Sequence, residues 1–206
     1  MDFERLQLVP LWIIAFLISG AFHEFAHAWS AYKLGDETAA REGRMTLNPL
    51  PHIDPVGLIF LVLIAISGIG IGWMKPVPVN PYNLRNPRRD MMLISLAGPA
   101  ANLILAAFFI VVIKVAPGLF VEGNPISKLL WVFLILNVVL AVFNLLPLYP
   151  LDGSKIVEGL LPEELVDTWA QTYRFGFIIL IVLFFTGILW RILDFVVGLV
   201  LLLIAL

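Results

Sequence analysis

The stretch LVPLWIIAFLISGAFHEFAHAWSAYKL, residues 8–34, decides how this chain folds, because it places a polar motif inside an apolar segment. A bilayer core about 30 Å thick is crossed by a helix of about 20 apolar residues, so this segment is long enough to span it. His23, Glu24 and His27 lie within the run, and ionisable groups at membrane depth are costly unless they have a partner. The stretch therefore predicts a transmembrane helix that holds a polar ligand.

The spacing of the three residues suggests what that ligand is. Histidines at i and i+4 lie on one face of a helix and can bind one metal ion, with a glutamate at i+1 placed to activate water at the metal. A chance match to this pattern is common in soluble proteins, but the cost of burial in an apolar helix makes chance a poor explanation here. We expect His23 and His27 to bind one zinc ion, Glu24 to act as general base, and hydrolysis to occur within the bilayer.

Composition supports a membrane protein throughout the chain. Of the 206 residues, 61% are hydrophobic and 14% charged, against about 25% charged in an ordinary soluble domain. We expect one membrane-embedded domain over residues 1–206, with a core at about 8–160 and a C-terminal helical segment at about 161–206. Cysteine is absent, so His and carboxylate side chains must hold any metal. A lipid bilayer is an expected partner, nucleic acid is not, and no feature indicates an oligomeric state.

The apolar segments predict an all-α polytopic fold. Four of them are long enough to cross a membrane, and they are roughly Leu8–Leu34, Met91–Val115, Ser127–Leu146 and Tyr173–Leu206. The last is too long for one span, so we expect a span followed by an interfacial or partial helix. Residues 74–82 carry alternate prolines, which favour an extended chain.

A third metal ligand must reach the depth of His23, which lies about 15 Å from the end of its helix at Lys33. Asp152, just past the end of the third long segment, is the best candidate. By itself it would suit a helix N-cap better, but beside a two-ligand site we favour the metal. The two helices must then end on the same side, which requires the short segment Val56–Trp73 to be re-entrant or interfacial and leaves a core of three spanning helices.

The distribution of cations gives an independent indication of topology. A re-entrant Val56–Trp73 places nine Lys and Arg residues on one side and three on the other, whereas a full span gives seven and five. The positive-inside rule favours the first arrangement, with the metal site near the cytoplasmic face. The nine are Lys33, Arg41, Arg44, Lys75, Arg85, Arg88, Arg89, Lys155 and Arg174, and the three are Arg5, Lys114 and Lys128.

Other polar residues permit two interpretations each. Asn144 can donate to an oxyanion or make an interhelical hydrogen bond. His52 and Asp54 can supply a further ligand or inhibitory contact, but a turn before Pro55 is the better explanation. The run SLAGPAAN, residues 95–102, is typical of close helix packing, and its Asn102 can brace the site.

Three motifs together resemble the site-2 protease family of intramembrane zinc metalloproteases. They are HEFAHAW at 23–29, LAGPAAN at 96–102 and NLLPLYPLDG at 144–153, in the family's order. The connecting pieces resemble those of small prokaryotic members, and no stretch is long enough for the PDZ-type domain of larger ones.

The resemblance implies one zinc ion held by His23, His27 and Asp152, with Glu24 as base and Asn144 binding the substrate or oxyanion. It also implies a transmembrane protein as substrate and a multi-pass protein of the prokaryotic plasma membrane. Two other functions are alternatives. One is a membrane metal carrier or metal-binding protein without proteolytic activity, and the other is an inactive homologue that acts as a binding module. A carrier needs ligands along a path, whereas these residues gather at one depth, and an inactive homologue would lack a ligand or the glutamate.

Overall fold

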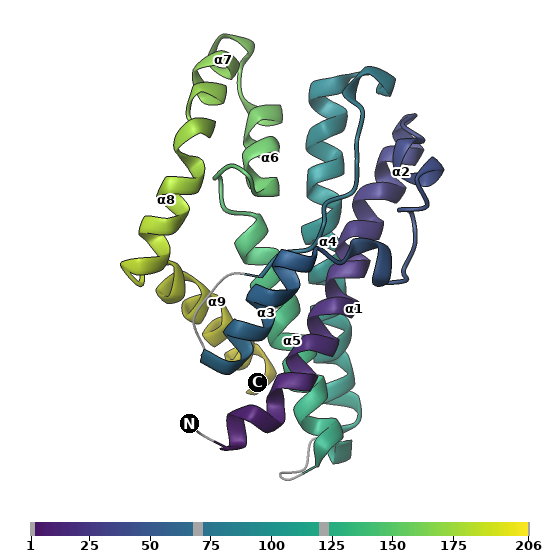
Figure 1. Ribbon diagram of the computed structural model, residues 1–206. Helices are drawn as coiled ribbons and strands as arrows, with labels where there is room; N and C mark the ends of the chain where they lie inside the picture. Colours follow the sequence, from purple (N-terminus) through teal and green to yellow (C-terminus); the bar gives the residue numbers. More distant parts are fainter. Residues whose placement is uncertain (1–2, 68–71, 120–123, 206) are drawn as a thin grey trace.

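The computed structural model describes residues 3–67, 72–119 and 124–205, and the secondary structure of these residues is entirely helical apart from turns and extended connections (Figure 1). Within these described ranges, three helices are long and apolar enough to cross a membrane, and they form the centre of the molecule. They are α1 (Phe3–Leu34), α4 (Pro87–Val115) and α5 (Pro125–Asn144). The predicted all-α membrane fold is confirmed.

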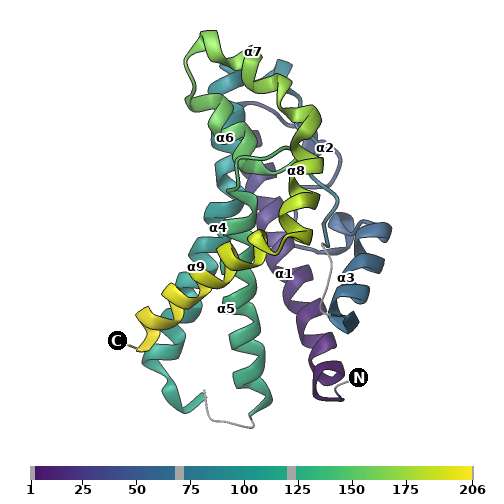
Figure 2. The same ribbon diagram turned by 90° about the vertical axis from the view of Figure 1, so that its left-hand side faces the viewer.

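The three long helices alternate in direction. α1 and α5 run the same way and α4 runs in the opposite direction, packed against both (Figures 1 and 2). α1 and α5 also meet directly, where Ala15 and Phe16 pack against Val132 and Leu136. Burial of these apolar side chains and the small Ala15 lets the helices approach closely. The C-terminal ends of α1 and α5 point toward the same end of the molecule (Figure 1), as a shared metal site requires.

The short segment after α1 turns back instead of crossing. α3 (Pro55–Ser67) is followed by an extended stretch at 72–80 that returns beside its start. The Lys75 backbone N–H donates to His52 O at 2.8 Å, so the chain before α3 and the chain after it lie side by side. A side chain on Gly57 would overlap the Trp73 carbonyl, because its Cβ would lie 2.2 Å from that oxygen. The re-entrant prediction for 56–73 is therefore confirmed for the residues on either side of 68–71, which lie outside the described residues.

Asp36 fastens the returning chain to the end of α1. Its fully buried carboxylate accepts hydrogen bonds from the Asn80 N–H at 2.7 Å and from Asn83 Nδ2 at 2.8 Å, and also from Thr38. Burial raises the pKa of Asp36, but the hydrogen bonds outweigh burial and leave the pKa below its usual value. Short helices occupy the rest of these connections, α2 (Thr38–Arg41), η1 (Leu50–His52), η2 (Pro81–Asn83) and η3 (Pro117–Leu119).

The C-terminal third forms an arm of four helices, α6 (Asp152–Leu160), α7 (Glu163–Gln171), α8 (Tyr173–Phe185) and α9 (Ile188–Ala205). α6 packs against α4, and α9 packs against α5 (Figure 2). Gly187, at φ +76°, separates α8 from α9. The predicted break in Tyr173–Leu206 thus lies at Gly187. α7 and α8 meet at a bend of 58°, and together they are long and apolar enough to form a fourth span.

Candidate active site

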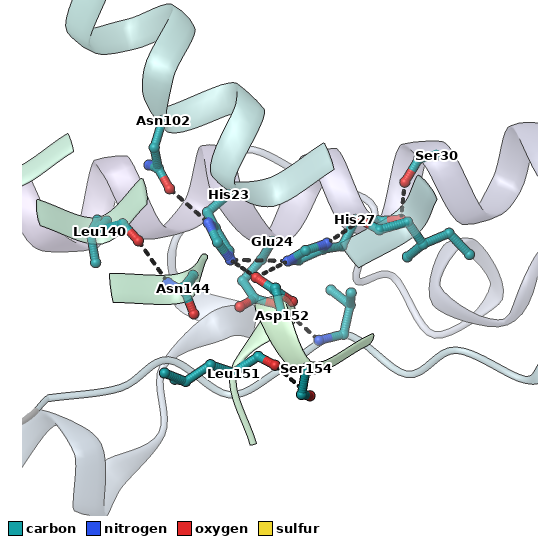
Figure 3. Close-up of polar contacts among 12 residues, drawn as sticks. His23, Glu24, His27, Ser30, Asn102, Leu140, Asn144, Leu151, Asp152 and Ser154 are labelled. Carbon is teal, nitrogen blue, oxygen red and sulfur yellow. Dashed lines mark hydrogen bonds and ion pairs between the residues drawn. The ribbon is translucent and has the colours of Figure 1, made fainter. Parts of the chain in front are cut away.

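The motif on α1 lies at the centre of the bundle. His23, Glu24 and His27 are each more than nine-tenths buried, and the two Nε2 atoms lie 2.9 Å apart (Figure 3). The i, i+4 spacing brings the rings together because four residues span slightly more than one helical turn. The two imidazoles therefore lie on one face of α1, as the spacing predicts.

Asp152 reaches the same point from the first turn of α6. Its Oδ2 lies 3.2 Å from His23 Nε2 and 3.3 Å from His27 Nε2. Gly153 makes this approach possible, because a Cβ there would lie 2.3 Å from the Leu146 carbonyl oxygen at the end of α5. Asp152 does not cap α6, since the N-cap is Leu151, so the side chain is free to face the histidines.

The protonation of the rings follows from their outer partners. His27 Nδ1 lies 2.7 Å from the Ile94 carbonyl, which can only accept, so Nδ1 carries the proton. His23 Nδ1 lies 2.7 Å from Asn102 Oδ1, also an acceptor. Both Nε2 atoms of the neutral rings then direct lone pairs at each other and at Asp152.

This cluster has the chemistry of a cation site. Three acceptor atoms converge within 3.3 Å, and the buried Asp152 Oδ2 has no hydrogen-bond partner among the described residues. Such a group of lone pairs is repulsive without a positive charge between them. Four ligands at zinc–ligand distances of 2.0–2.1 Å in a tetrahedron are separated by about 3.3 Å, close to the separations found here. His23, His27 and Asp152 therefore fit a zinc ion and leave a fourth position open.

Gly98 allows α4 to pass directly beside the histidines. A Cβ at this position would lie 2.3 Å from His27 Nε2 and 2.7 Å from His23 Cε1. Real Cβ atoms do not approach other atoms so closely, so no other residue fits without displacing the rings. The close packing expected for residues 95–102 thus occurs at the site itself.

Glu24 is held by the returning extended chain. Its Oε2 accepts the Val77 backbone N–H at 2.9 Å. Arg44 fixes the neighbouring backbone, because its guanidinium donates to the carbonyls of Lys75 at 2.7 Å and Pro76 at 3.1 Å. Of the stretch 74–82 predicted to be extended, residues 74–80 are extended, with proline on both sides of Val77, whereas Pro81 and Tyr82 belong to η2. The sequence did not reveal that this stretch would contact Glu24.

Asn144 lies at the end of α5 beside the cluster (Figure 3). Its Nδ2 donates to the Leu140 carbonyl of its own helix at 3.0 Å, so neither an interhelical bond nor a contact with the ligands is seen for it among the described residues. One N–H of the amide remains available for donation. The oxyanion role stays a prediction.

His52 and Asp54 do not join the cluster. His52 is fully buried in η1, and its Nε2 contacts the Thr46 carbonyl at 2.9 Å. Asp54 Oδ1 accepts the Gly57 N–H at 2.8 Å and so caps α3. The turn interpretation of these two residues is the one the structure supports.

Two residues near the site were missed by the sequence analysis. Ser19 and Asn137 are fully buried and hydrogen-bond to Asn102, which itself contacts His23. Their sequence signal is weak, because an isolated polar residue in an apolar span indicates an interhelical hydrogen bond but does not identify its partner.

Comparisons with known proteins point to zinc metalloproteases. The model of Peptidase family M50 matches residues 112–185. The chain is 43% identical over 198 residues to "Putative zinc metalloprotease YwhC" of Bacillus subtilis, covering 92% of this chain and 88% of that protein. It is 34% identical over 186 residues to "Putative zinc metalloprotease Rip2" of Mycolicibacterium smegmatis, covering 87% and 68%. It is 24% identical over 156 residues to "Zinc metalloprotease MJ0392" of Methanocaldococcus jannaschii, covering 74% and 36%. No solved structure gave a significant match.

Proposed function

The chain belongs to peptidase family M50, the site-2 protease family, and we propose that it hydrolyses peptide bonds in or near transmembrane segments of membrane-protein substrates. One observation carries this proposal. Three metal-ligand atoms converge within 3.3 Å inside a membrane bundle, and a buried glutamate lies next to one of them on the same helix. A set of three protein ligands is typical of catalytic zinc sites, whereas structural zinc sites use four.

We assign His23, His27 and Asp152 as the ligands of one zinc ion and Glu24 as the general base. Bound there, zinc supplies a Lewis acid that polarises the scissile carbonyl and makes water more acidic. Glu24 accepts the proton of the attacking water and returns it to the leaving amine. The Val77 N–H holds one carboxylate oxygen, which leaves the other free to exchange the proton.

Asn144 is assigned as the donor to the carbonyl oxygen of the substrate. It lies eight residues before Asp152 in sequence and beside it in Figure 3. One amide hydrogen bonds to Leu140 O, which orients the group, and the second can donate to developing negative charge. Loss of one such donor typically lowers kcat by about 10²–10³-fold.

We place the protein in a prokaryotic plasma membrane with the site near the cytoplasmic face. With Val56–Trp73 re-entrant, the order of segments in the sequence puts nine Lys and Arg residues on the side of the membrane where α1 ends and three on the other side. Positive charge accumulates on the cytoplasmic side of membrane proteins. We also treat residues 1–206 as one protease domain with its core at about 8–160, because the assigned ligands come from α1 and α6.

The test is metal analysis of the purified protein combined with cleavage of a model transmembrane substrate. Glu24→Gln should retain one zinc per chain and lose cleavage, because glutamine still fits beside Val77 but cannot take a proton. Asp152→Ala should lose both zinc and cleavage. Cleavage by Glu24→Gln at the wild-type rate would contradict the mechanism, and wild-type protein without zinc would contradict the site.

A further inference from the structure

Three polar side chains lie fully buried within the long helices, one on each. They are Ser19 on α1, Asn102 on α4 and Asn137 on α5, and none is exposed to any extent. Buried amides in an apolar bundle are costly unless all their donors and acceptors are paired. Their contacts form one connected network.

Two backbone carbonyls fix the orientation of both amides. The Asn102 amide atom 3.3 Å from the Ser19 carbonyl must be the donor Nδ2, because a carbonyl can only accept. The Asn137 amide atom 2.8 Å from the Phe133 carbonyl must be Nδ2 for the same reason. Asn137 Oδ1 is then left to accept from Asn102 Nδ2 at 2.9 Å, and Asn137 Nδ2 donates its other hydrogen to Ser19 Oγ at 2.8 Å.

The last hydrogen bond of this network is made to His23. With Nδ2 turned to Ser19 O, Asn102 presents Oδ1 to His23 Nδ1 at 2.7 Å. His23 must therefore carry its proton on Nδ1 and direct the Nε2 lone pair toward Asp152. The opposite tautomer would put a proton on the atom 3.2 Å from Asp152 Oδ2, where the metal is assigned.

We propose that Ser19, Asn102 and Asn137 are positioning residues that set the tautomer and orientation of His23 for zinc. The inference rests on the proposed function, because it takes His23 as a zinc ligand. Hydrogen bonds to the outer nitrogen of a metal-binding histidine typically change metal affinity 10–100-fold, about the range expected here. Asn137 acts at a distance, since it touches Asn102 and no assigned ligand.

The experiment measures the zinc affinity of the purified full-length chain by competition with a chromogenic chelator. Asn102→Leu should raise the zinc Kd about 10–100-fold, and Asn137→Leu on the order of 10-fold. Asn102→Asp should bind zinc more tightly than Asn102→Leu, because its carboxylate still accepts from His23 Nδ1. Ser30→Ala is the matched control on α1, because its hydroxyl bonds the His27 carbonyl outside the network, and its Kd should equal that of wild type.

The outcomes separate this inference from the proposed function. A wild-type chain without zinc affinity overturns the proposed function, whereas wild-type affinity retained by folded Asn102→Leu and Asn137→Leu overturns only the network's role. If those variants do not fold, ¹⁵N-histidine NMR of the wild-type apoprotein decides. The chain has three histidines, so each is assignable with single variants. A proton on Nδ1 alone in His23 supports the proposal, and any other protonation state of that ring overturns it.

Discussion

At the residue scale, the absence of a side chain at position 98 is as necessary to the site as the proposed ligands are. Gly98 is the point where α4 passes His23 and His27, and its neighbours leave no room for a methyl group. The ligand pair on α1 was predictable from spacing alone. Gly98 was not, because its need for a missing Cβ arises from a contact between residues 71 positions apart.

Gly98→Ala should abolish zinc binding, because the new Cβ would displace His27 Nε2 from a position only 2.3 Å away. Overpacking of this kind costs about 1–3 kcal/mol, so the protein should still fold. Zinc content per chain and the thermal unfolding midpoint measure the two effects. Gly198→Ala on α9 is the control, since nothing lies within 4 Å of its Cβ. Equal zinc content in both variants would contradict the packing argument.

At the element scale, the extended chain at 72–80 connects Arg44 to Glu24, the proposed general base. Arg44 is nine-tenths buried and holds the Lys75 and Pro76 carbonyls, and the next N–H is the one that Glu24 accepts. Prolines predicted that this chain is extended, and cations predicted that α3 turns back. The place where the chain docks could not be predicted, because backbone groups of Lys75 and Val77 make the contacts and carry no side-chain signal.

Arg44→Gln should lower kcat while zinc content stays at the wild-type level. Loss of a charged hydrogen bond costs about 1.5–3 kcal/mol, and displacement of a reacting group by about 1 Å can cost 10²-fold in rate. Single-turnover cleavage and metal analysis of the same sample test this. Arg41→Gln, which removes an exposed ion pair with Glu37, should cleave normally. A normal rate in Arg44→Gln would show that the backbone keeps its position unaided.

Asp36 makes the docking of this chain dependent on pH. Its folded-state pKa lies below the unfolded value, so its stabilising contribution is complete above the unfolded pKa of about 3.9 and is lost as pH falls through the folded pKa. Asp36→Asn should therefore lower the unfolding midpoint at pH 7, and the difference from wild type should shrink as pH is lowered below about 4. Thermal unfolding of both proteins at several pH values checks the sign, with exposed Asp167→Asn as control. A difference independent of pH would refute the role assigned to the carboxylate.

At the scale of the whole molecule, the metal site joins the N-terminal helix to the arm that begins at α6. Its three ligand residues come from positions 23, 27 and 152, so any bound ion crosslinks distant parts of the chain. The fold class followed from hydropathy, and the distribution of cations indicated that the segment containing α3 turns back. The break at Gly187 could be expected from segment length but not located, since several glycines and polar residues occur in that region.

Removal of zinc should destabilise the whole protein and not the site alone. A ligand present at 1,000 times its Kd stabilises the folded state by about 4.1 kcal/mol, so a chelator should lower the unfolding midpoint of wild type. Asp152→Ala should show no such difference between chelated and zinc-loaded samples. An unchanged wild-type midpoint after demonstrated zinc loss would mean that the arm is held without the metal.

The side-by-side ends of α1 and α4 are testable by labelling, because the chain has no cysteine of its own. Glu42→Cys and Tyr82→Cys, both exposed, should react with an impermeant maleimide from the cytoplasmic side. Gly118→Cys, beyond the far end of α4, should react from the opposite side. Labelling of residues 42 and 82 from different sides would refute the re-entrant topology.

The brevity of α3 has a consequence for the surrounding lipid. A helix of 13 residues reaches about 20 Å at most, whereas the hydrocarbon core is about 30 Å thick. Acyl chains beside α3 must therefore bend under it or thin the bilayer on that flank of α1. A transmembrane helix of ordinary length that diffuses into the thinned zone is too long for it, and the mismatch pushes one of its ends toward water. Unwinding of a substrate helix would then begin in the lipid, before it meets any side chain of the enzyme.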